Sequence, residues 1–254
     1  MMLEVRNLTV IYDARGAANE AVKDVSFAVE ENSFCGLIGE SGSGKSTVLM
    51  TLLGLLPAGA EARGEIVYKG RNILGLPEDE LAKLRQREIA LVPQGALNSF
   101  TPVMTIGRHI KEVLEVHLGV KGEDAERRTA ELLEEVELPA SIAGRYPHEL
   151  SGGQKQRAAI ALALSCEPSL VLADEPTTAL DVITQAAILR LLEKLRREKN
   201  LTILLVTHDL PMAASACSEL FVMKDGRLIE SGAPRDLIRA PKEEHTKALI
   251  AAML

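Results

Sequence analysis

The chain has 254 residues, 46% of them hydrophobic and 26% charged, and a formal net charge of −7. This composition is ordinary for a soluble globular protein, and the acidic balance argues against a constitutive nucleic-acid binder. The three scattered cysteines show no metal-ligand spacing, the start resembles no secretory signal, and no apolar run approaches about 18 residues. We therefore expect a reduced, cytosolic chain and, if it serves transport, a membrane part on another polypeptide.

The amino-terminal residues alternate between apolar and polar side chains, a pattern that predicts strands. Leu3–Val10 and Val25–Glu30 alternate in this way, and the polar segment Asp13–Glu20 between them is typical of a turn. We expect an antiparallel, hairpin-like sheet here. The short apolar run Cys35–Gly39 then predicts a buried parallel strand. A helix after this strand is predicted by one-face apolar spacing at Val48, Leu49, Leu52, Leu53 and Leu56.

From Met104 to about Leu164 the pattern changes to helices. The first is predicted by a stripe at Ile106, Ile110, Val113 and Leu114. A charged helix over Glu123–Glu137 follows, and a third helix is expected to begin at Ser151. Strand signals then return at Leu170–Ala173 and Leu201–Val206, with a helix between them that carries Ile188, Leu191, Leu192 and Leu195 on one face. The sequence thus predicts an α/β sheet interrupted by a helical insertion.

The segment between the Cys35–Gly39 strand and the helix after it has the pattern of a phosphate-binding loop, Gly39-x4-Gly44-Lys45-Ser46. Glycines let backbone N–H groups curl around phosphate oxygens without Cβ clashes. Lys45 is expected to reach the β and γ phosphates of a nucleotide, and the Ser46 hydroxyl to ligate Mg²⁺. The residues expected to contact the nucleotide are Gly39, Glu40, Ser41, Gly42, Ser43, Gly44, Lys45, Ser46 and Thr47.

Polar side chains follow three of the predicted strands. Asp174 and Glu175 end the strand Leu170–Ala173, where Asp174 is expected to hold Mg²⁺ and Glu175 to polarise the attacking water. His208 follows a strand end, where a histidine can sense the γ phosphate. Gln94 follows the strand-like run Ile89–Val92, where its amide can contact Mg²⁺ or water.

The segment Ser151–Gln154 predicts a helix start with Ser151 as N-cap. Bare N–H groups beyond such a cap can bind an anion that arrives from outside the subunit, while an ordinary capped helix is the alternative explanation. The remaining histidines show no metal-ligand spacing and are interpreted as surface or packing residues: His109, His117, His148 and His245.

Together these motifs resemble the ABC ATPase family, in order and across nearly the full chain. The matched motifs are Walker A (Gly39–Thr47), the Q-loop (Gln94), the signature (Leu150–Gln154), Walker B (Leu170–Glu175), the D-loop (Thr178–Asp181) and the switch histidine (His208). Tyr12 stands where the family places an aromatic ring that stacks on adenine. The resemblance implies that Ser151, Gly152, Gly153 and Gln154 contact the ATP bound by a second subunit, with Asp181 in the dimer loop.

The family resemblance also implies the architecture: a P-loop NTPase (RecA-like) core with an amino-terminal antiparallel β subdomain and an inserted α-helical subdomain. Residues 1–254 are then one ABC ATP-binding domain, with the catalytic core at about 1–94 and 165–254 and the insertion at about 95–164. The implied catalytic residues are Lys45, Gln94, Glu175 and His208, and the implied Mg²⁺ ligands are Ser46, Gln94 and Asp174.

A narrower resemblance is to importers of dipeptides, oligopeptides or nickel. It is carried by the segments Gln94–Ser99, Arg145–Leu150 and His245–Leu249, while Thr101 departs from the asparagine usual in that group. The chain stops at Leu254 without the longer cysteine-bearing extension of many oligopeptide subunits, a length that resembles the short dipeptide or nickel subunits.

This subfamily resemblance implies an ATP-hydrolysing subunit that powers an importer for small peptides or nickel. Its implied partners are a second ABC ATPase subunit, the same or a related chain, two transmembrane permease subunits and, indirectly, an extracytoplasmic substrate-binding protein, with no nucleic acid. It would sit peripherally on the cytoplasmic face of the membrane and relay closure through the insertion around Ala96–Ile110. The alternative is a soluble accessory ATPase, as in the phosphonate carbon–phosphorus lyase system.

Overall fold

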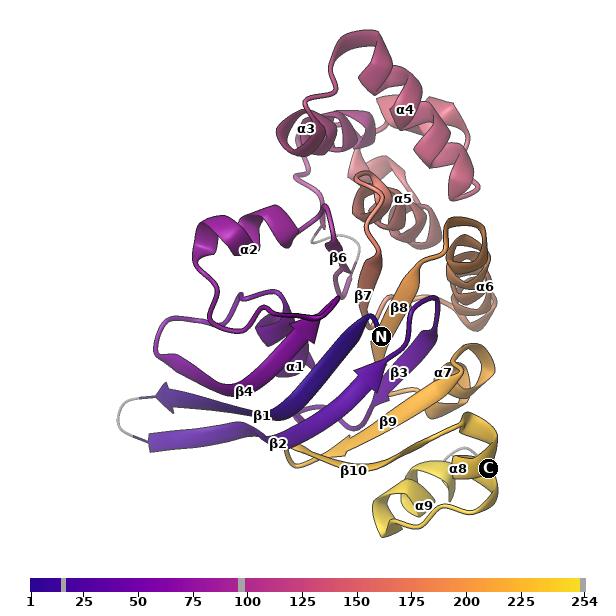
Figure 1. Ribbon diagram of the computed structural model, residues 1–254. Helices are drawn as coiled ribbons and strands as arrows, with labels where there is room; N and C mark the ends of the chain where they lie inside the picture. Colours follow the sequence, from indigo (N-terminus) through magenta and orange to yellow (C-terminus); the bar gives the residue numbers. More distant parts are fainter. Residues whose placement is uncertain (15–16, 96–98, 252–254) are drawn as a thin grey trace. The chain divides into compact units, whose positions relative to one another are not determined.

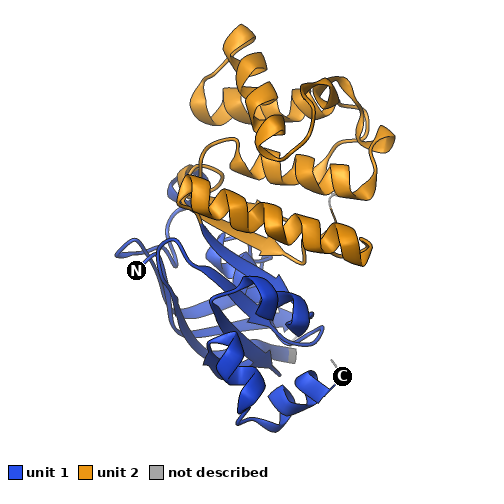
Figure 2. Ribbon diagram, turned by 90° about the vertical axis from the view of Figure 1, so that its right-hand side faces the viewer, with its two compact units in different colours: residues 1–82, 202–254 blue, residues 83–201 orange. Residues whose placement is uncertain are grey.

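The computed structural model describes residues 1–14, 17–95 and 99–251 (Figure 1). Part of the predicted relay segment, Ala96–Asn98, and the terminal Leu254 lie outside the described residues. The chain forms two compact units, which Figure 2 shows in different colours. Unit 1 comprises residues 1–82 and 202–254, and unit 2 comprises residues 83–201. The chain passes from unit 1 to unit 2 within helix α2 (Glu78–Leu84).

Unit 1 contains an antiparallel sheet with the strand order β2-β1-β4-β5. Its strands are β1 (Leu3–Ala14), β2 (Ala17–Val29), β4 (Ala60–Tyr68) and β5 (Arg71–Asn72). The predicted hairpin is confirmed, but the bounds of the turn predicted at Asp13–Glu20 are wrong, and residues 15–16 of it lie outside the described residues. Asp13 pairs with Ala18 and Tyr12 with Asn19, so most of that polar segment is strand. Strand propensity depends on cross-strand neighbours, and here pairing outweighs the polar composition.

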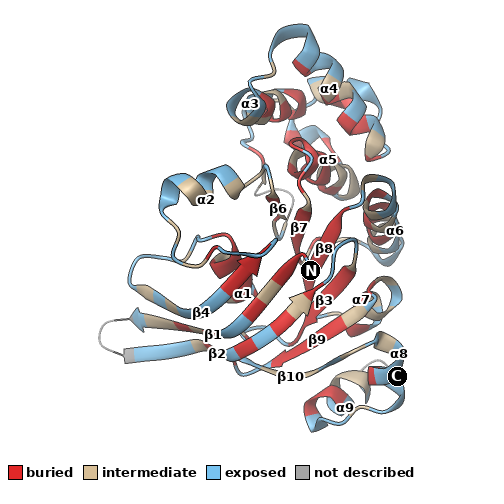
Figure 3. Cartoon of the chain, viewed as in Figure 1, coloured by how far each residue is buried: buried red, intermediate tan, exposed pale blue. Residues whose placement is uncertain are grey.

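A second sheet region of unit 1 has the order β10-β9-β3-β8. Its strands are β3 (Phe34–Ile38), β8 (Thr202–Thr207), β9 (Glu219–Lys224) and β10 (Arg227–Gly232). Strand β3 runs parallel to both β8 and β9, while β10 pairs antiparallel with β9. Every residue of β3 and β8 is buried (Figure 3). Continuous apolar runs of this kind are typical of parallel strands covered on both faces.

Helix α7 (Leu210–Ala216) of unit 1 begins at a start signal in the sequence. It is capped by Asp209, whose Oδ1 accepts the Met212 N–H at 2.8 Å, and the helix contacts β3 and β8. The other helices of this unit are α1 (Lys45–Leu52), α8 (Pro234–Arg239) and α9 (Glu244–Ala251). The predicted helix after Lys45 is confirmed, but it ends at Leu52, before the predicted face residues Leu53 and Leu56.

Unit 2 contains the parallel strand pair β6 (Ile89–Val92) and β7 (Leu170–Asp174). Both strands lie where buried apolar runs predict them. The long helix α6 (Val182–Lys199) follows β7, with Ile188, Leu191, Leu192 and Leu195 buried as predicted.

Between β6 and β7 the chain of unit 2 is helical, as predicted for the insertion. The elements are α3 (Ile106–Leu118), α4 (Gly122–Glu135), the short 3₁₀ helices η2 (Ala140–Gly144) and η3 (Pro147–Glu149), and α5 (Gly152–Leu164). The fully buried side chains Ile106, Ile110 and Leu114 face inward from α3. α4 ends at Glu135, not at the predicted Glu137, because Glu137 adopts a left-handed backbone conformation with φ of 60°.

The architecture is mixed α/β, with an antiparallel sheet and a helical segment, as expected. The compact units divide the chain differently from the predicted core and insertion, since unit 2 also contains β6, β7 and α6. The partition at about residues 95 and 164 stays a prediction. Among the residues described, no helix combines the length and apolar content needed to cross a membrane.

Candidate nucleotide site

The glycine-rich loop of unit 1 connects buried strand β3 to helix α1, the context that a phosphate-binding loop requires. Gly44 lies at the N-cap of α1 with φ of 103°. A Cβ atom on Gly44 would lie 2.6 Å from the Ala21 carbonyl oxygen, and one on Gly39 would collide with the Met223 carbonyl. These two positions therefore require glycine, both for backbone conformation and for space.

Lys45 folds back into the loop that precedes it. Its ammonium group donates to the carbonyl oxygens of Gly39 at 2.7 Å and Glu40 at 2.8 Å, and to Ser43 Oγ at 3.3 Å. The side chain is only 5% exposed. A buried cation needs partners of this kind, so Lys45 holds the loop in its curled form with its charge at the start of α1.

The turn between β9 and β10 supports the loop from outside, and sequence reasoning missed it. The Gly226 N–H donates to the Ser43 carbonyl at 3.1 Å, and the Gly226 carbonyl accepts the Lys23 N–H at 2.8 Å. Asp225 and Gly226 have φ of 48° and 83°, as a two-residue type I′ hairpin turn requires. The Asp-Gly dipeptide is a turn signal that could have revealed the hairpin, although its contact with Ser43 is long-range.

Tyr12 and His208 lie near the phosphate loop within unit 1. The Tyr12 hydroxyl donates to Thr47 Oγ1 at 3.2 Å, which brings this ring beside the first turn of α1. His208 is exposed and directly follows β8, whose last residue, Thr207, pairs with Ile38 at the end of β3. The carboxyl ends of parallel strands share one sheet edge, so His208 and the loop leave from the same edge.

In unit 2 the ends of β6 and β7 bring together the other predicted catalytic groups. Val92 pairs with Ala173, so Gln94 and Glu175 leave the strand pair at one edge. Gln94 Nε2 donates to Glu175 Oε2 at 3.0 Å. Asp174 is 8% exposed at the end of β7. This amide–carboxylate contact was not predicted, because it joins residues far apart in the sequence.

Glu175 is positioned by its backbone as well as by its partners. Its φ of 43° is a left-handed conformation that a non-glycine residue adopts at some cost. The Thr178 hydroxyl donates to Glu175 Oε2 at 3.0 Å, and the Thr178 N–H donates to the Glu175 carbonyl at 3.1 Å. The carboxylate is therefore aimed by a tight turn directly after β7, a geometry often found at functional sites.

The signature segment begins helix α5 as predicted. Ser151 Oγ accepts the Gln154 N–H at 3.3 Å, and Gln154 Oε1 accepts the Ser151 N–H at 3.0 Å, a reciprocal capping box. Ser151 and Gly152 are exposed. The helix start thus presents backbone N–H groups at the surface of unit 2, which suits binding of an anion.

Asp181 caps helix α6 next to this segment. Its carboxylate accepts the Thr184 N–H at 3.0 Å and the Thr184 hydroxyl at 2.6 Å. These hydrogen bonds lower the pKa of Asp181 below its ordinary value, and the bond from the Thr184 hydroxyl has the larger effect. The predicted dimer-loop residue is thus an ionised N-cap on the exposed surface.

The candidate residues fall into two groups, one on each unit. Unit 1 carries the phosphate loop, Tyr12 and His208, while unit 2 carries Gln94, Asp174 and Glu175, the signature and Asp181. In residues 1–14, 17–95 and 99–251, no group of three or more His, Cys, Asp or Glu side chains forms a metal site. The predicted Mg²⁺ ligand set uses a hydroxyl and an amide besides Asp174, so it differs from such a cluster.

His109 is a packing residue, as interpreted from the sequence. Its Nε2 accepts the Thr101 N–H at 2.8 Å, and its Nδ1 lies 2.8 Å from the Thr105 carbonyl, to which it donates. The ring also packs edge-on against Phe100, with 5.2 Å between ring centroids. His109 therefore fixes the segment that leads into α3.

Comparison with known proteins decides the family. The family model described as "ABC transporter" matches residues 22–178. The chain belongs to the ABC transporter family. As a member of that family it binds nucleotide and is an ATPase, in agreement with the phosphate loop and the Asp174–Glu175 pair.

Known relatives of this ABC subunit are similar to it in sequence over almost its whole length. It is 40% identical to the oligopeptide transport ATP-binding protein OppD of Haemophilus influenzae, over 99% of this chain and 79% of the relative. Among solved structures, the ATP-binding cassette MJ0796 is 34% identical to this chain, with a TM-score of 0.82. That structure is a dimer in a post-hydrolysis state with ADP and Pi, and the match covers 92% of this chain and 99% of MJ0796. CbiO1 of Clostridium perfringens is 26% identical with a TM-score of 0.81, covering 100% and 99%.

Proposed function

We propose that this ABC subunit binds and hydrolyses ATP to power an importer of small peptides, as a peripheral protein on the cytoplasmic face of a membrane. The observation that carries the proposal is its 40% identity to oligopeptide transport ATP-binding proteins over 99% of the chain. The oligopeptide transport of these relatives favours peptides over nickel as the substrate. Two separate permease subunits would span the membrane, and an extracytoplasmic binding protein would deliver the peptide to them.

The working form is a dimer of two copies of this chain with ATP between them. Every motif needed for both sites is present in one chain, and the dimeric cassette MJ0796 supports this arrangement. Beside the exposed Ser151 and Gly152, helix α6 begins with two apolar side chains, Val182 and Ile183, that are 79% and 80% exposed. Exposed apolar side chains next to an anion-binding helix start suit a surface that a second copy covers.

Hydrolysis would require a base beside the γ phosphate of ATP. Glu175 is the candidate, because Gln94 and Thr178 orient its carboxylate and a strained turn aims it away from β7. It would accept the proton of the attacking water, while Lys45 neutralises charge on the β and γ phosphates. His208 would donate a hydrogen bond to the γ phosphate and so distinguish ATP from ADP.

Mg²⁺ is the metal that these ligand types favour. Ser46 is exposed at the start of α1, Asp174 supplies a carboxylate, and the Gln94 amide directs its nitrogen to Glu175, leaving Oε1 as the ligand atom. Oxygen-only ligands of this kind fit Mg²⁺. When bound, the ion would neutralise phosphate charge, and ATP binding is expected to require all three residues.

Closure of the dimer would be relayed to the permease subunits through the start of the helical segment, whose described part is Ser99–Ile110. Val103 is 77% exposed there, while His109 holds the Thr101 backbone by accepting its N–H. Closure is coupled to transport only if ATP binds the closed state more tightly than the open one. Hydrolysis and loss of the γ phosphate would then reopen the dimer.

Affinity purification tests the importer assignment. The chain is tagged in its own cells, membranes are solubilised in mild detergent, and the co-purifying proteins are identified, with the exposed-residue variant Lys121→Ala as the control for tagging and handling. We expect two multi-span permease subunits. Recovery of soluble enzymes alone, with no tagged chain in the membrane fraction, would overturn transport and favour an accessory ATPase.

Uptake of a labelled tripeptide and of Ni²⁺ by cells lacking the chain then distinguishes the two substrates.

Tyr12 is expected to stack on adenine, and its position beside Thr47 suits that role. Tyr12→Ala should weaken ATP binding by about ten-fold, since base stacking on an aromatic side chain contributes about 1–3 kcal/mol. Tyr12→Phe keeps the ring and should bind ATP within about two-fold of the parent, because it loses only the part-buried hydrogen bond to Thr47. Calorimetric titration with ATP and with tripolyphosphate, which has no base, measures both effects. An equal loss of tripolyphosphate binding in Tyr12→Ala would contradict stacking.

A further inference from the structure

The carboxyl end of helix α4 is held by an arginine from the signature helix. Val136 is the C-cap of α4, and its carbonyl belongs to the last turn, where helical partners run out. Arg157, on α5, donates from Nη1 to this carbonyl at 3.0 Å. The arginine side chain is 17% exposed, so the contact is partly shielded from water.

The next residue, Glu137, joins two helices at once. Its Oε2 accepts from Arg157 Nη1 at 2.6 Å, and its Oε1 lies 3.8 Å from Lys194 Nζ on α6. The left-handed backbone at Glu137, with φ of 60°, ends α4 at this point. One carboxylate therefore contacts the helix that begins at the signature and the helix that begins at Asp181.

The starts of these same helices also touch. A Cβ atom on Gly152 would lie 3.0 Å from the Leu180 side chain, and one on Gly153 would lie 2.8 Å from the Thr184 side chain. The two glycines thus let the signature approach the turn before α6 and its first residues. The helices are fixed at two levels, by this contact at their starts and by Glu137 farther along.

We infer that Glu137 is a positioning residue for the ATP-bound dimer. Through Arg157 and Lys194 it fixes α5 and α6 in one register, so that the signature and Asp181 form a single surface toward the nucleotide of the second copy. The inference rests on the proposed dimer. A site built from two copies tolerates little displacement, since a 1 Å misplacement can cost about 10²-fold in rate.

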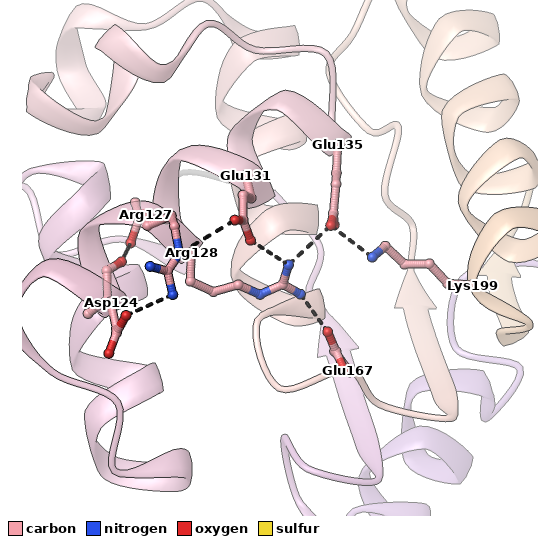
Figure 4. A network of polar contacts seen from close by, with 9 residues as sticks. Asp124, Arg127, Arg128, Glu131, Glu135, Glu167 and Lys199 are labelled. Carbon is pink, nitrogen blue, oxygen red and sulfur yellow. Dashed lines mark hydrogen bonds and ion pairs between the residues drawn. The ribbon is translucent and has the colours of Figure 1, made fainter.

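A second ion-pair group on α4 provides a matched control. Figure 4 shows Arg128 between Glu131, Glu135 and Glu167, with Lys199 also on Glu135. Arg128 lies 3.3 Å from Glu135, and Lys199 lies 2.9 Å from it. Glu135 is thus, like Glu137, a carboxylate paired with one arginine and one lysine, but its arginine lies on α4 itself and not on α5, and its lysine is the last residue of α6.

Exposure makes this control a stringent one. The Glu135 side chain is 25% exposed and that of Glu137 is 49% exposed. Ion pairs nearer the surface contribute less to folding stability. Loss of Glu135 should therefore disturb folding at least as much as loss of Glu137, so a larger effect of Glu137 on dimer formation cannot come from stability.

The experiment measures the Kd of ATP-dependent dimer formation in a Glu175→Gln background. Glu137→Ala should raise this Kd by about ten-fold, equivalent to about 1.4 kcal/mol. Glu135→Ala should leave it within about two-fold, and Glu137→Gln, which keeps an acceptor for Arg157, should lie between them. Binding of a fluorescent ATP analogue to dilute, monomeric chain should be the same in all variants, because the phosphate loop is untouched.

Three outcomes contradict this account in distinguishable ways. Equal dimer Kd values for Glu137→Ala and its parent overturn the positioning role. An equally large effect of Glu135→Ala assigns the loss to general disruption of α4 and also overturns it. A Glu175→Gln parent that binds ATP but never dimerises overturns the proposed dimer itself, before Glu137 is changed.

Discussion

Replacement of Glu175 by glutamine is expected to lower kcat for ATP hydrolysis by about 10²- to 10⁴-fold, the usual contribution of a general base. Glutamine has the same shape, and its amide oxygen can accept the contacts from Gln94 and Thr178, each 3.0 Å long in the parent chain. What it cannot do is accept the proton of the attacking water. The chemical step should fail while the loop and its lysine still bind ATP.

The measurement is steady-state release of phosphate together with ATP titration of the same sample. Glu126→Gln serves as the matched control, because that carboxylate is 68% exposed on α4 and pairs only with Lys111 among the described residues. It should hydrolyse ATP at the parent rate. Hydrolysis by Glu175→Gln at that rate would sink the assignment of Glu175 as base.

Lys45→Ala is expected to weaken ATP binding by at least about 10²-fold, the loss of one or two charge-assisted hydrogen bonds to phosphate. The change also removes three contacts that keep the loop curled, those to Gly39, Glu40 and Ser43. Both effects act in the same direction, so binding and hydrolysis should be lost together.

Calorimetric titration with ATP measures this loss, and thermal unfolding checks that the variant is folded. Lys121→Ala is the control, since Lys121 is 66% exposed and forms a surface ion pair with Glu115. Its ATP affinity should equal that of the parent. A folded Lys45→Ala chain with parental affinity would refute the role of Lys45 at the phosphates.

Much of the site could be predicted from the sequence because its signals are local. The phosphate loop follows a buried apolar segment that ends in glycine. Ser151 and Gln154 form a capping box within four residues. Patterns of this kind predict both the local backbone conformation and the chemical groups that the segment presents. The strands β6 and β7 and the face of α6 were predictable for the same reason.

What escaped prediction depends on contacts between distant segments. The support of the loop by Gly226, the bond from Gln94 to Glu175 and the Glu137–Arg157 pair each join residues whose proximity only folding creates. The polar strand ends around Asp13 were predicted as a turn, because local composition does not show cross-strand pairing. The left-handed backbone at Glu175 has no sequence signature at all.

In the proposed dimer, the signature of one copy completes the nucleotide site of the other. Sedimentation velocity of the Glu175→Gln chain, with and without saturating ATP and Mg²⁺, tests it most directly. We expect a monomer without nucleotide, a dimer with ATP, and no dimer with ADP. A chain that calorimetry shows to be saturated with ATP and that still sediments as a monomer at every concentration would contradict it.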